Sequence, residues 1–528
     1  MRTLPPIRSA SEPDELEPST RAIVDAAEKR GIPWSCLGDG LVQLGYGRHR
    51  KFIHGAMGSQ TSAVAVAVAG DKAHTKALLA RAGVPAPAGR VVRSAEEAAT
   101  AVDEIGPPVA IKPLDANHGK GVSLDLWTGE QAVYAYEIAS QFSRRVVVEQ
   151  MLEGRDYRVL VVGGRVVAAC ERIPARVIGD GASTIQELIG QTPIRVDRGC
   201  LSLLNKQGFQ LDSVPPREFA VHLRESANLA DGGAAVDVTG RVHPSIARIC
   251  ERAARAVGLD ICGVDLVVAD ISEPFTDGGV VELNAAPDIR MHHCPSEGEA
   301  RDVASAIVRM LYPEGNARIP IVSVAGLNDT AGVARLVAHI LAEGGSRIGT
   351  TTAEQRSSAA VLFDPEVDLA VLEAETATGD LAFDWCDVAV MTGMESHGAE
   401  RVREGGTLVL NADDESMGAA AAIGRNVVWY ALHASNAALE GARRQGATVY
   451  YVDQGHIHEV TGANRRRIMN VAEMRIDSAG VALAAVAACR ALGTGVAQIR
   501  AGLRSFQTGA ETATAGLFAV AGKSVLLD

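Results

Sequence analysis

Three oxygen-bearing side chains fall on two neighbouring stretches that are expected to be strands. Glu282 and Asn284 end the β-branched run VVELN, and alternation along a strand would place both side chains on one face. A second expected strand, GVDLVV, lies just upstream and carries Asp265. Carboxylate and amide oxygens at neighbouring strand ends suit Mg²⁺ that is held against nucleotide phosphates. The pattern predicts half of an ATP site, although strand-end polar residues that contact only solvent would give the same spacing.

A second group of candidates consists of residues that could hold phosphates. Lys112 lies inside PPVAIKP, an expected apolar strand, where an unpaired ammonium would be costly, so we expect a buried anion beside it. The loop DANHGKGV follows, and its glycines would let backbone N–H groups close over phosphates while its lysine adds charge. A lone GKG is weak support, and its position after the Lys112 strand strengthens it. The candidate ATP contacts in this loop are His118, Gly119, Lys120 and Gly121.

Further candidates lie on a helix and on a strand. Residues 71–83 have helical spacing, and Lys72 and Lys76 lie one turn apart on the expected helix, although ordinary solvated lysines would look the same. The expected strand VVVEQML could offer backbone groups to an adenine ring, and Asp156 beyond it could accept from ribose hydroxyls. The candidate nucleoside contacts on that strand are Glu149, Gln150 and Leu152.

Several arginines could meet anionic groups. Arg158 and Arg172 lie on the hairpin that follows, and the guanidinium fork matches a carboxylate or a phosphate, although each could be a surface arginine. Arg290 follows an Ala-Ala-Pro turn after the VVELN strand. A polar, glycine-containing stretch that suits a γ-phosphate or an acyl phosphate includes Arg224, Asn228, Gly232 and Gly233.

Composition narrows the class of protein. A chain of 528 residues predicts about three domains of roughly 150 residues each. With 47% hydrophobic and 22% charged residues it is ordinary globular material, and a net charge of -13 argues against a nucleic-acid surface. No run of about 18 apolar residues is present, and the polar, acidic N-terminus is unlike a signal peptide. The eight cysteines lack a CxxC spacing, so we expect reduced thiols and a cytoplasmic location.

The order of these parts resembles that of ATP-grasp ligases and, more narrowly, of the cyanophycin synthetase family, from about Pro18 to the end of the chain. The stretches that carry the resemblance are LVQLGYG, TSAVAVAVAGDKAHTKALLARAGVPAP, IKPLDANHGKGV, RDYRVLVVGGRVVAACERIPARVIGDGASTIQELI, ANLADGG and NAAPDIRMHHCPSEG. The generic ATP-grasp pattern would not separate this family from D-alanine ligases, whereas these longer stretches do.

The resemblance implies that ATP activates a carboxylate as an acyl phosphate, which an amine then attacks to give an amide. It implies ATP and Mg²⁺ as cofactors and an amino acid, dipeptide or polymer as substrate. It assigns phosphates to Lys72, Lys112 and Lys120, the nucleoside to 149–152 and Asp156, Mg²⁺ to Asp265, Glu282 and Asn284, and charge stabilisation on the transferring phosphoryl group to Arg224 and Arg290. The expected substrate contacts are Arg158, Arg172, Asn228, Asp288 and His292.

The chain departs from the family pattern at places that concern the substrate. The family usually has glycine after NAAP, where this chain has Asp288, a carboxylate at the expected approach of the substrate's own carboxylate. An LSTGG-type stretch has become residues 229–233, LADGG, which loses two hydroxyls. Only the last portion of the family's N-terminal domain is recognised, in residues 18–55.

From Ile319 the layout of strand, loop and helix resembles a Mur ligase with a P-loop of the GTNGKTT type. In the corresponding stretch, 326–332, Thr330 replaces the phosphate lysine and Ala331 the Mg²⁺ hydroxyl. Asp329 adds a negative charge that would repel phosphate. Other Mur-type loops are reduced to AETATG and to TGMESHG. We therefore expect an α/β domain without ligase activity that is retained for packing, oligomerisation or polymer holding.

The sequence thus predicts an α/β and α+β multidomain protein in which an ATP-grasp fold precedes a doubly wound, P-loop-like domain of the Mur ligase type. The expected parts are a tail and N-terminal remnant (1–60), the ATP-grasp domain (61–315), the degenerate Mur-like domain (316–505) and the start of a third Mur lobe (506–528). Because alternating addition of Asp and Arg needs two activation sites, we expect a ligase that polymerises β-aspartyl-arginine dipeptides at one site. The alternatives are a ligase for another amino acid or peptide and a non-catalytic polymer-binding partner. We expect a homo-oligomer that binds neither nucleic acid nor membrane.

Overall fold

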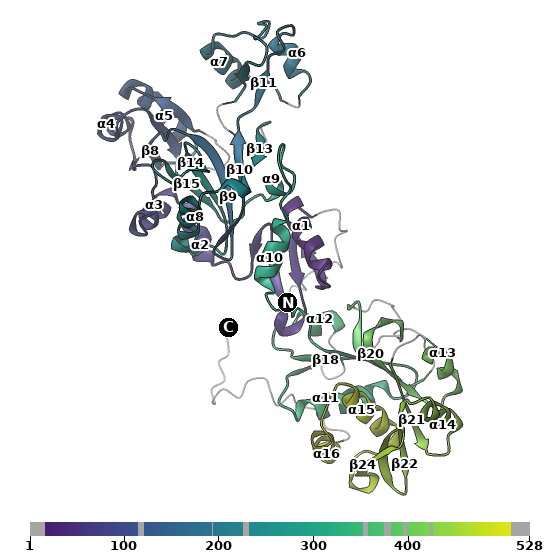
Figure 1. The fold of residues 1–528 in the computed structure, drawn as a ribbon. Helices are drawn as coiled ribbons and strands as arrows, with labels where there is room; N and C mark the ends of the chain where they lie inside the picture. Colours follow the sequence, from purple (N-terminus) through teal and green to yellow (C-terminus); the bar gives the residue numbers. More distant parts are fainter. Residues whose placement is uncertain are drawn as a thin grey trace, which may run out of the picture. The chain divides into compact units, whose positions relative to one another are not determined.

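The computed structural model describes residues 16–114, 121–192, 194–224, 227, 232–351, 357–373, 382–393, 399–422 and 426–507. They belong to two compact units (Figure 1). The first unit falls within Met1–Gln43 and Lys51–Gly315, and the second within Leu44–Arg50 and Asn316–Asp528. None of the described helices is both long and apolar enough to cross a membrane.

The N-terminal part of the first unit is a small sheet next to two helices that pack against each other. Helix α1 (Pro18–Glu28) begins with a proline at its first turn, which suits that position, and Glu17 accepts from the Thr20 N–H. Its buried side packs against α10 (Val303–Leu311). The sheet has the strand order β1 (Trp34–Gly38), β2 (Leu41–Leu44), β3 (Lys51–His54) and β4 (Met57–Gly58).

A four-stranded antiparallel sheet carries the expected phosphate strand at its centre. The strand order is β5 (Gly89–Val92), β8 (Val146–Gln150), β6 (Val109–Pro113) and β7 (Ser123–Leu126). Helices α4 (Ala95–Ile105) and α5 (Gly129–Ser140) bury small alanine side chains against the apolar residues of β6 and β8. The predicted strands PPVAIKP and VVVEQML are therefore neighbours in one sheet.

The second sheet of this unit is antiparallel and has one apolar face. Its order is β13 (Ala234–Asp237), β10 (Arg165–Ile173), β9 (Arg155–Val162), β14 (Ile261–Val268) and β15 (Gly279–Asn284). Helix α8 (Pro244–Val257) packs on the apolar face together with α2 (Ala63–Gly70) and α3 (Lys72–Arg81). Gly258 ends α8 in the left-handed conformation that favours glycine. The alternate residues of these strands form the other face, which carries the polar side chains Arg158 and Asp265.

A small lobe with its own core is inserted between β10 and β13. It contains β11 (Arg176–Ile178), β12 (Ala220–His222), α6 (Ile185–Ile189) and α7 (Arg198–Lys206). Helix α7 turns Cys200 and Leu204 into this core, where they meet Val177, Ile185 and Leu223. Asp197 caps α7 by accepting from the Cys200 N–H at 2.9 Å.

The second unit is one nine-stranded sheet with helices on both faces. The order is β17 (Ile348–Thr350), β18 (Leu369–Glu373), β16 (Ile321–Ala325), β19 (Cys386–Met391), β20 (Val402–Asn411), β21 (Asn426–His433), β22 (Thr448–Asp453), β23 (His456–Thr461) and β24 (Asn464–Asn470). The strands are parallel from β17 to β22, and the last two are antiparallel. The strands that follow β16 in the chain lie first on one side of it, as β17 and β18, and then on the other side, from β19 onward. The strand order therefore changes direction at β16, which is the switch point of a doubly wound sheet.

Two separate cores confirm that both faces of this sheet are covered. One lies beneath α11 (Thr330–Ala342), α15 (Ala479–Ala491) and α16 (Val496–Ser505). The other lies beneath α12 (Ser358–Phe363) and α13 (Gly418–Ala421), and α14 (Ala437–Arg444) covers a smaller cluster. The alanine-rich helix α15 is buried along most of its length and belongs to the first of these cores.

Residues 44–50 complete the core of the second unit. Tyr46 is buried there, and its N–H donates to the Ala317 carbonyl. Gly47 has a φ of 56°, and a Cβ at this position would lie 2.6 Å from the Val367 carbonyl oxygen, so only glycine fits. This short segment of the expected N-terminal remnant is thus part of the second unit, and the predicted four-part division of the chain stays a prediction.

Candidate active site

A row of chemically active side chains crosses the polar face of the five-stranded sheet. In register across β15, β14, β9, β10 and β13 the row consists of Glu282, Asp265, Arg158, Cys170 and Asp237. Residues directly opposite each other on neighbouring strands share a face, so this register brings the two predicted metal carboxylates together. The intervening residues, such as Tyr157 and Val264, point into the core under α8.

Asp265 is a buried carboxylate held by two arginines. It is 6% exposed, and Arg158 donates to it through Nε and through Nη2, the latter over 3.2 Å. Arg172 Nη2 lies 3.2 Å from Asp265 and also donates to Asp156 at 2.6 Å. Burial alone would raise the pKa of Asp265, but the two guanidinium groups hold it below its ordinary value. Two predicted substrate arginines thus neutralise a predicted metal ligand and a predicted ribose contact.

The donor set of the predicted Mg²⁺ site fits the ion in chemical type. Glu282 pairs with Asp265 in register, and Asn284 lies two residues further along, with its amide nitrogen 3.4 Å from the Gly263 carbonyl oxygen. Lys72 Nζ approaches Glu282 at 3.5 Å. The described residues contain no group of three or more His, Cys, Asp or Glu arranged to hold a metal ion. An ion at these oxygens would therefore take its other ligands from a nucleotide or from water.

The buried anion predicted beside Lys112 is a carboxylate of the chain itself. Glu149, on the neighbouring strand β8, is only 2% exposed and binds both Lys112 and Lys76, the latter at 2.5 Å. Burial would raise the pKa of Glu149, but the two lysines hold it below its ordinary value. Burial lowers the pKa of Lys76 although Glu149 opposes the shift. The Glu149 side chain is thus used internally.

The lysines of α3 are not ordinary solvated lysines, so that interpretation is wrong. The side chains of Lys72 and Lys76 are 15% and 17% exposed, because the face of α3 that carries both turns toward the strands. The sequence analysis named Lys76 beside Lys72 but gave it no partner and no role. Its position one turn after Lys72 is the only local signal, since its partner Glu149 lies 73 residues away.

Two of the backbone N–H groups that were expected to be open to adenine donate to carbonyl groups of the chain. The Gln150 N–H donates to the Ala88 carbonyl at 2.7 Å, and the Met151 N–H donates to the Pro108 carbonyl at 3.1 Å. These two donors are thus occupied by the chain, and Leu152, which follows them, is half-buried. The adenine-binding role of 149–152 stays a prediction.

Asp288 is tied to Arg290, two residues later. Arg290 donates from Nε at 2.9 Å and from Nη2 at 2.5 Å to Asp288 Oδ2, and the Ser19 hydroxyl lies 3.5 Å from Oδ1. Burial would raise the pKa of Asp288, but Arg290 holds it below its ordinary value. The Asp288 carboxylate therefore neutralises the arginine that was expected to stabilise the phosphoryl group.

His292 lies behind the row. It is 1% exposed, its Nδ1 lies 3.3 Å from the Cys170 Sγ, and its Nε2 has no hydrogen-bond partner among the described atoms. Burial and the nearby charge of Arg158 lower its pKa to about 3, so the imidazole is neutral near pH 7. Cys170 was missed as a neighbour of the site, although it lies two residues before Arg172 and so on the same face of β10.

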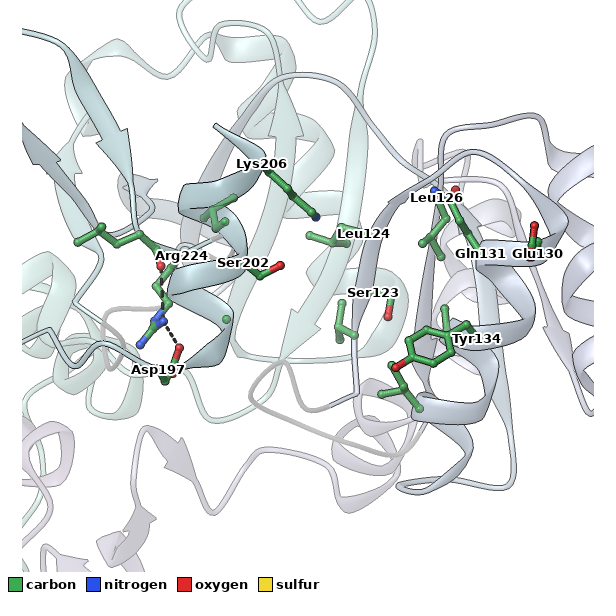
Figure 2. A pocket seen from close by; sticks show the side chains of 16 residues that line it. Ser123, Leu124, Leu126, Glu130, Gln131, Tyr134, Asp197, Ser202, Lys206 and Arg224 are labelled. Carbon is green, nitrogen blue, oxygen red and sulfur yellow. Dashed lines mark hydrogen bonds and ion pairs between the residues drawn. The ribbon is translucent and has the colours of Figure 1, made fainter. Parts of the chain in front are cut away.

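Arg224 is held in the lobe and not in the row. Its Nη1 donates to Asp197 and its Nη2 to the Arg195 carbonyl, each at 2.8 Å. Figure 2 shows this pair on one wall of a cavity that also contacts β7 and α5. The two predicted catalytic arginines thus have different partners, since Arg224 binds Asp197 and Arg290 binds Asp288.

Some predicted contacts lie outside the described residues, namely His118, Gly119, Lys120 and Asn228. Gly121, at the end of the phosphate loop, is described. Its φ is 69°, and a Cβ there would lie 2.6 Å from the Phe142 ring, so the position favours glycine. Gly232 has a φ of 90°, which favours glycine for the same reason.

The chain was compared with known proteins. A family profile described as a RimK-like ATP-grasp domain matches residues 69–179, which confirms the predicted ATP-grasp fold. A cyanophycin synthetase from Nostoc sp. is 38% identical over 93% of this chain and 62% of the relative. Another from Geminocystis herdmanii is 36% identical over 97% of this chain and 67% of the relative. The chain belongs to the cyanophycin synthetase family.

This member of the cyanophycin synthetase family spans 62% and 67% of the length of these two cyanophycin synthetases. Among solved structures, it is similar to the bifunctional glutathione synthetase from Pasteurella multocida. That similarity has 29% identity and a TM-score of 0.46, and it covers 57% of this chain and 44% of the other.

Proposed function

We propose that this cyanophycin synthetase family member is an ATP-dependent carboxylate–amine ligase whose reaction takes place in the first unit. A substrate carboxylate oxygen would attack the γ-phosphorus of ATP, ADP would leave, and an amine would then attack the acyl phosphate and release phosphate. The observation that carries the proposal is the row from Glu282 to Arg158, in which two neighbouring carboxylates lie beside an arginine on one sheet face. Such a face stabilises charge that develops during phosphoryl transfer.

The side chains of the site divide into three roles in this proposal. Lys72 and Lys112, together with Lys120, would hold phosphates. Asp265, Glu282 and Asn284 would hold Mg²⁺, which when bound neutralises charge on the transferring phosphoryl group. Arg158 and Arg172 both bind Asp265 in the structure. Once Mg²⁺ shares the Asp265 carboxylate, the two arginines would turn toward a carboxylate of the substrate, because a guanidinium binds either carboxylate well.

We propose that the second unit is of the Mur ligase type and has no ligase activity. Asp329, at a φ of 44°, caps α11 and accepts from the Gly332 N–H at 3.0 Å. Its carboxylate therefore occupies the helix N-terminus where a phosphate would bind. The Thr330 hydroxyl, at the position of the family lysine, donates to Glu373. One remaining ATP site supports polymerisation of preformed β-aspartyl-arginine dipeptides.

Several expectations belong to the same proposal. They are the four-part division of the chain, a cytoplasmic location, homo-oligomerisation and the use of an amino acid, dipeptide or polymer substrate. Two other functions would use the same fold: ligation of a different amino acid or peptide, which Asp288 favours, and polymer binding without catalysis.

The deciding experiment measures ADP formation by the purified chain with ATP and Mg²⁺. One reaction receives β-aspartyl-arginine dipeptide and another receives free Asp plus Arg, each with and without a short polymer primer. Turnover with the dipeptide alone supports the proposal. Absence of turnover with intact ATP binding points to another substrate, and absence of both points to the binding-protein alternative. Lys112→Ala and Glu282→Ala serve as inactive controls.

A further inference from the structure

Arg158 has two neighbours in register on its face of the five-stranded sheet. Asp265 of β14 lies opposite it on one side, and Cys170 of β10 lies opposite it on the other. Its Nε and Nη2 both donate to Asp265. When the guanidinium turns to a substrate carboxylate, that carboxylate can take two of its five N–H donors. Because Arg158 is only 8% exposed, the remaining donors need acceptors from the protein.

The strand beside Arg158 leaves space for such a turn. Gly263 lies two residues before Asp265 and so on the same face of β14. A Cβ at Gly263 would lie 3.3 Å from Nη1 of Arg158 and 2.8 Å from the Cβ of Pro287. Any larger side chain at this position would crowd the guanidinium, so glycine keeps the space next to it open.

Two groups on the far side of Arg158 are poor acceptors for its freed N–H groups. Asp237 already accepts from Nε of Arg301 at 3.1 Å, from Nη2 of Arg301 at 2.6 Å and from the Thr239 hydroxyl at 2.6 Å. Burial raises the pKa of the Cys170 thiol to about 12, so Cys170 keeps its proton, and a thiol sulfur accepts only weakly. An acceptor for Arg158 must therefore come from a third residue.

His292 is held in a fixed place behind Cys170. Its backbone N–H donates to the Ile289 carbonyl at 3.1 Å, and its carbonyl accepts from the Arg301 N–H at 2.7 Å. Its ring nitrogen Nδ1 lies 3.3 Å from the Cys170 sulfur. Within the described part of the chain, only Nε2 of this buried residue is left without a hydrogen-bond partner. A buried polar atom of this kind calls for an explanation.

The ring of His292 has the right protonation state to accept a hydrogen bond. Burial, and after it the charge of Arg158, lowers the pKa of His292 to about 3, so the ring is neutral and Arg158 is close enough to act on it. The Cys170 thiol can donate to the Met291 carbonyl at 3.4 Å while Nδ1 of His292 donates to the sulfur. In that arrangement the lone pair of the imidazole is on Nε2.

We propose that His292 is a positioning residue for Arg158, whose guanidinium donates to Nε2 of His292 when it turns from Asp265 to the substrate carboxylate. The inference rests on the proposed function, because this turn is the step in which Arg158 meets the substrate. His292 stays buried and acts through Arg158, without touching ATP or the substrate itself. The imidazole thus fixes the direction in which the guanidinium presents its other N–H groups.

The first test is steady-state ADP formation with β-aspartyl-arginine dipeptide. His292→Leu removes the acceptor but keeps an apolar side chain in the core, and we expect the KM for the dipeptide to rise about tenfold while the KM for ATP does not change. His292→Gln, whose amide oxygen can accept, should keep a KM close to that of the wild type. His293→Leu is the matched control and should leave both KM values unchanged. Circular dichroism checks that each variant is folded.

A double-mutant cycle tests whether His292 acts through Arg158. Arg158→Lys removes the planar fork, so adding His292→Leu to it should raise the KM for the dipeptide no further. Additive effects of the two substitutions would overturn the proposal. Equal losses in His292→Gln and His292→Leu would also overturn it, because a role in packing alone does not distinguish an acceptor from an apolar group.

Nitrogen NMR of the full chain with ¹⁵N-labelled histidine provides a readout that needs no turnover. The Nε2 resonance of His292 is identified by its loss in His292→Gln. It should shift when Mg²⁺ and a non-hydrolysable ATP analogue are added, because Mg²⁺ at Asp265 releases Arg158. A resonance that stays unchanged would overturn the inference. Failure of the proposed function is distinguishable, since it would abolish dipeptide-dependent ADP formation in the wild-type chain whether or not this resonance shifts.

Discussion

The two candidate phosphate sites of this chain differ in whether lysines and arginines lie against their carboxylates. In the first unit, lysines and arginines bind buried carboxylates of the chain. An anionic ligand that enters this site would meet these cations and could take the place of a carboxylate as their partner. In the second unit, the loop before α11 places the carboxylate of Asp329 on the helix N-terminus. Both sites keep the strands and helices that position them. The comparison teaches that the strands and helices of a site do not by themselves decide which charges the site presents.

The largest effect should follow the removal of the central carboxylate of the row. Asp265→Asn removes the carboxylate that pairs with the buried Arg158 and leaves Arg172 with Asp156 alone, which should lower the free energy of unfolding of the first unit by about 3 kcal/mol. Dipeptide-dependent ADP formation should fall at least about 100-fold, since a charged ligand of the phosphoryl site is lost. Denaturant unfolding and an ADP assay measure the two effects. Wild-type activity in this variant would remove the row from the mechanism.

Acidification should weaken the first unit through Glu149. Its pKa is lower in the folded chain than in the unfolded chain, so it stabilises the fold above the ordinary glutamate pKa. That contribution is lost as the pH falls from there through the folded pKa. Glu149→Gln should therefore reduce the pH dependence of unfolding over this acidic range and lower stability at pH 7. An unchanged slope of unfolding free energy against pH would contradict the assignment.

Replacement of Asp288 should change substrate use more than stability. Asp288→Gly releases Arg290 from its ion pair, and we expect the KM for the substrate carboxylate to fall by roughly tenfold because one opposing charge is removed. The conservative Asp288→Asn variant should give part of the gain. Steady-state kinetics with dipeptide provide the measurement. No gain with any dipeptide would count against the polymerase proposal.

The smallest effect should come from the second unit. Asp329→Asn keeps a cap at the start of α11 but removes the negative charge, so binding of inorganic phosphate should improve by a few-fold while stability stays within about 0.5 kcal/mol. No ligase activity should appear. Titration calorimetry with phosphate gives the affinity. Tight ATP binding to the wild-type loop would break the comparison between the two sites.

Local sequence patterns predicted which strands carry the site residues, but they did not predict which side chains pair with each other. Alternation along VVELN and GVDLVV placed Glu282, Asn284 and Asp265 on one face, because strand periodicity is a property of a few successive residues. The triad of Lys76, Glu149 and Lys112 was not predicted. It depends on the pairing of β6 with β8 and on the packing of α3, which no short stretch records.

Residue type alone also did not decide which anionic group each arginine binds. The guanidinium fork of Arg158 matched a carboxylate or a phosphate of a ligand. In the structure it binds Asp265 of the same chain, which only the register of β9 with β14 decides. In the same way, the helix signal before α11 was visible, whereas the left-handed conformation of Asp329 was not. Partners that depend on register or on a single unusual φ value need coordinates.

The short segment around Tyr46 precedes most of the first unit in the chain but belongs to the second unit, and this limits how the second unit could be exchanged between genes. Because Gly47 and Tyr46 fill a slot between Ile319 and Val367, a gene fragment that encodes only the region after residue 315 would lack a piece of its own interior. Recombination could not exchange the second unit cleanly at a single breakpoint. An exchange of the second unit between related genes would have to include residues 44–50 as a separate piece.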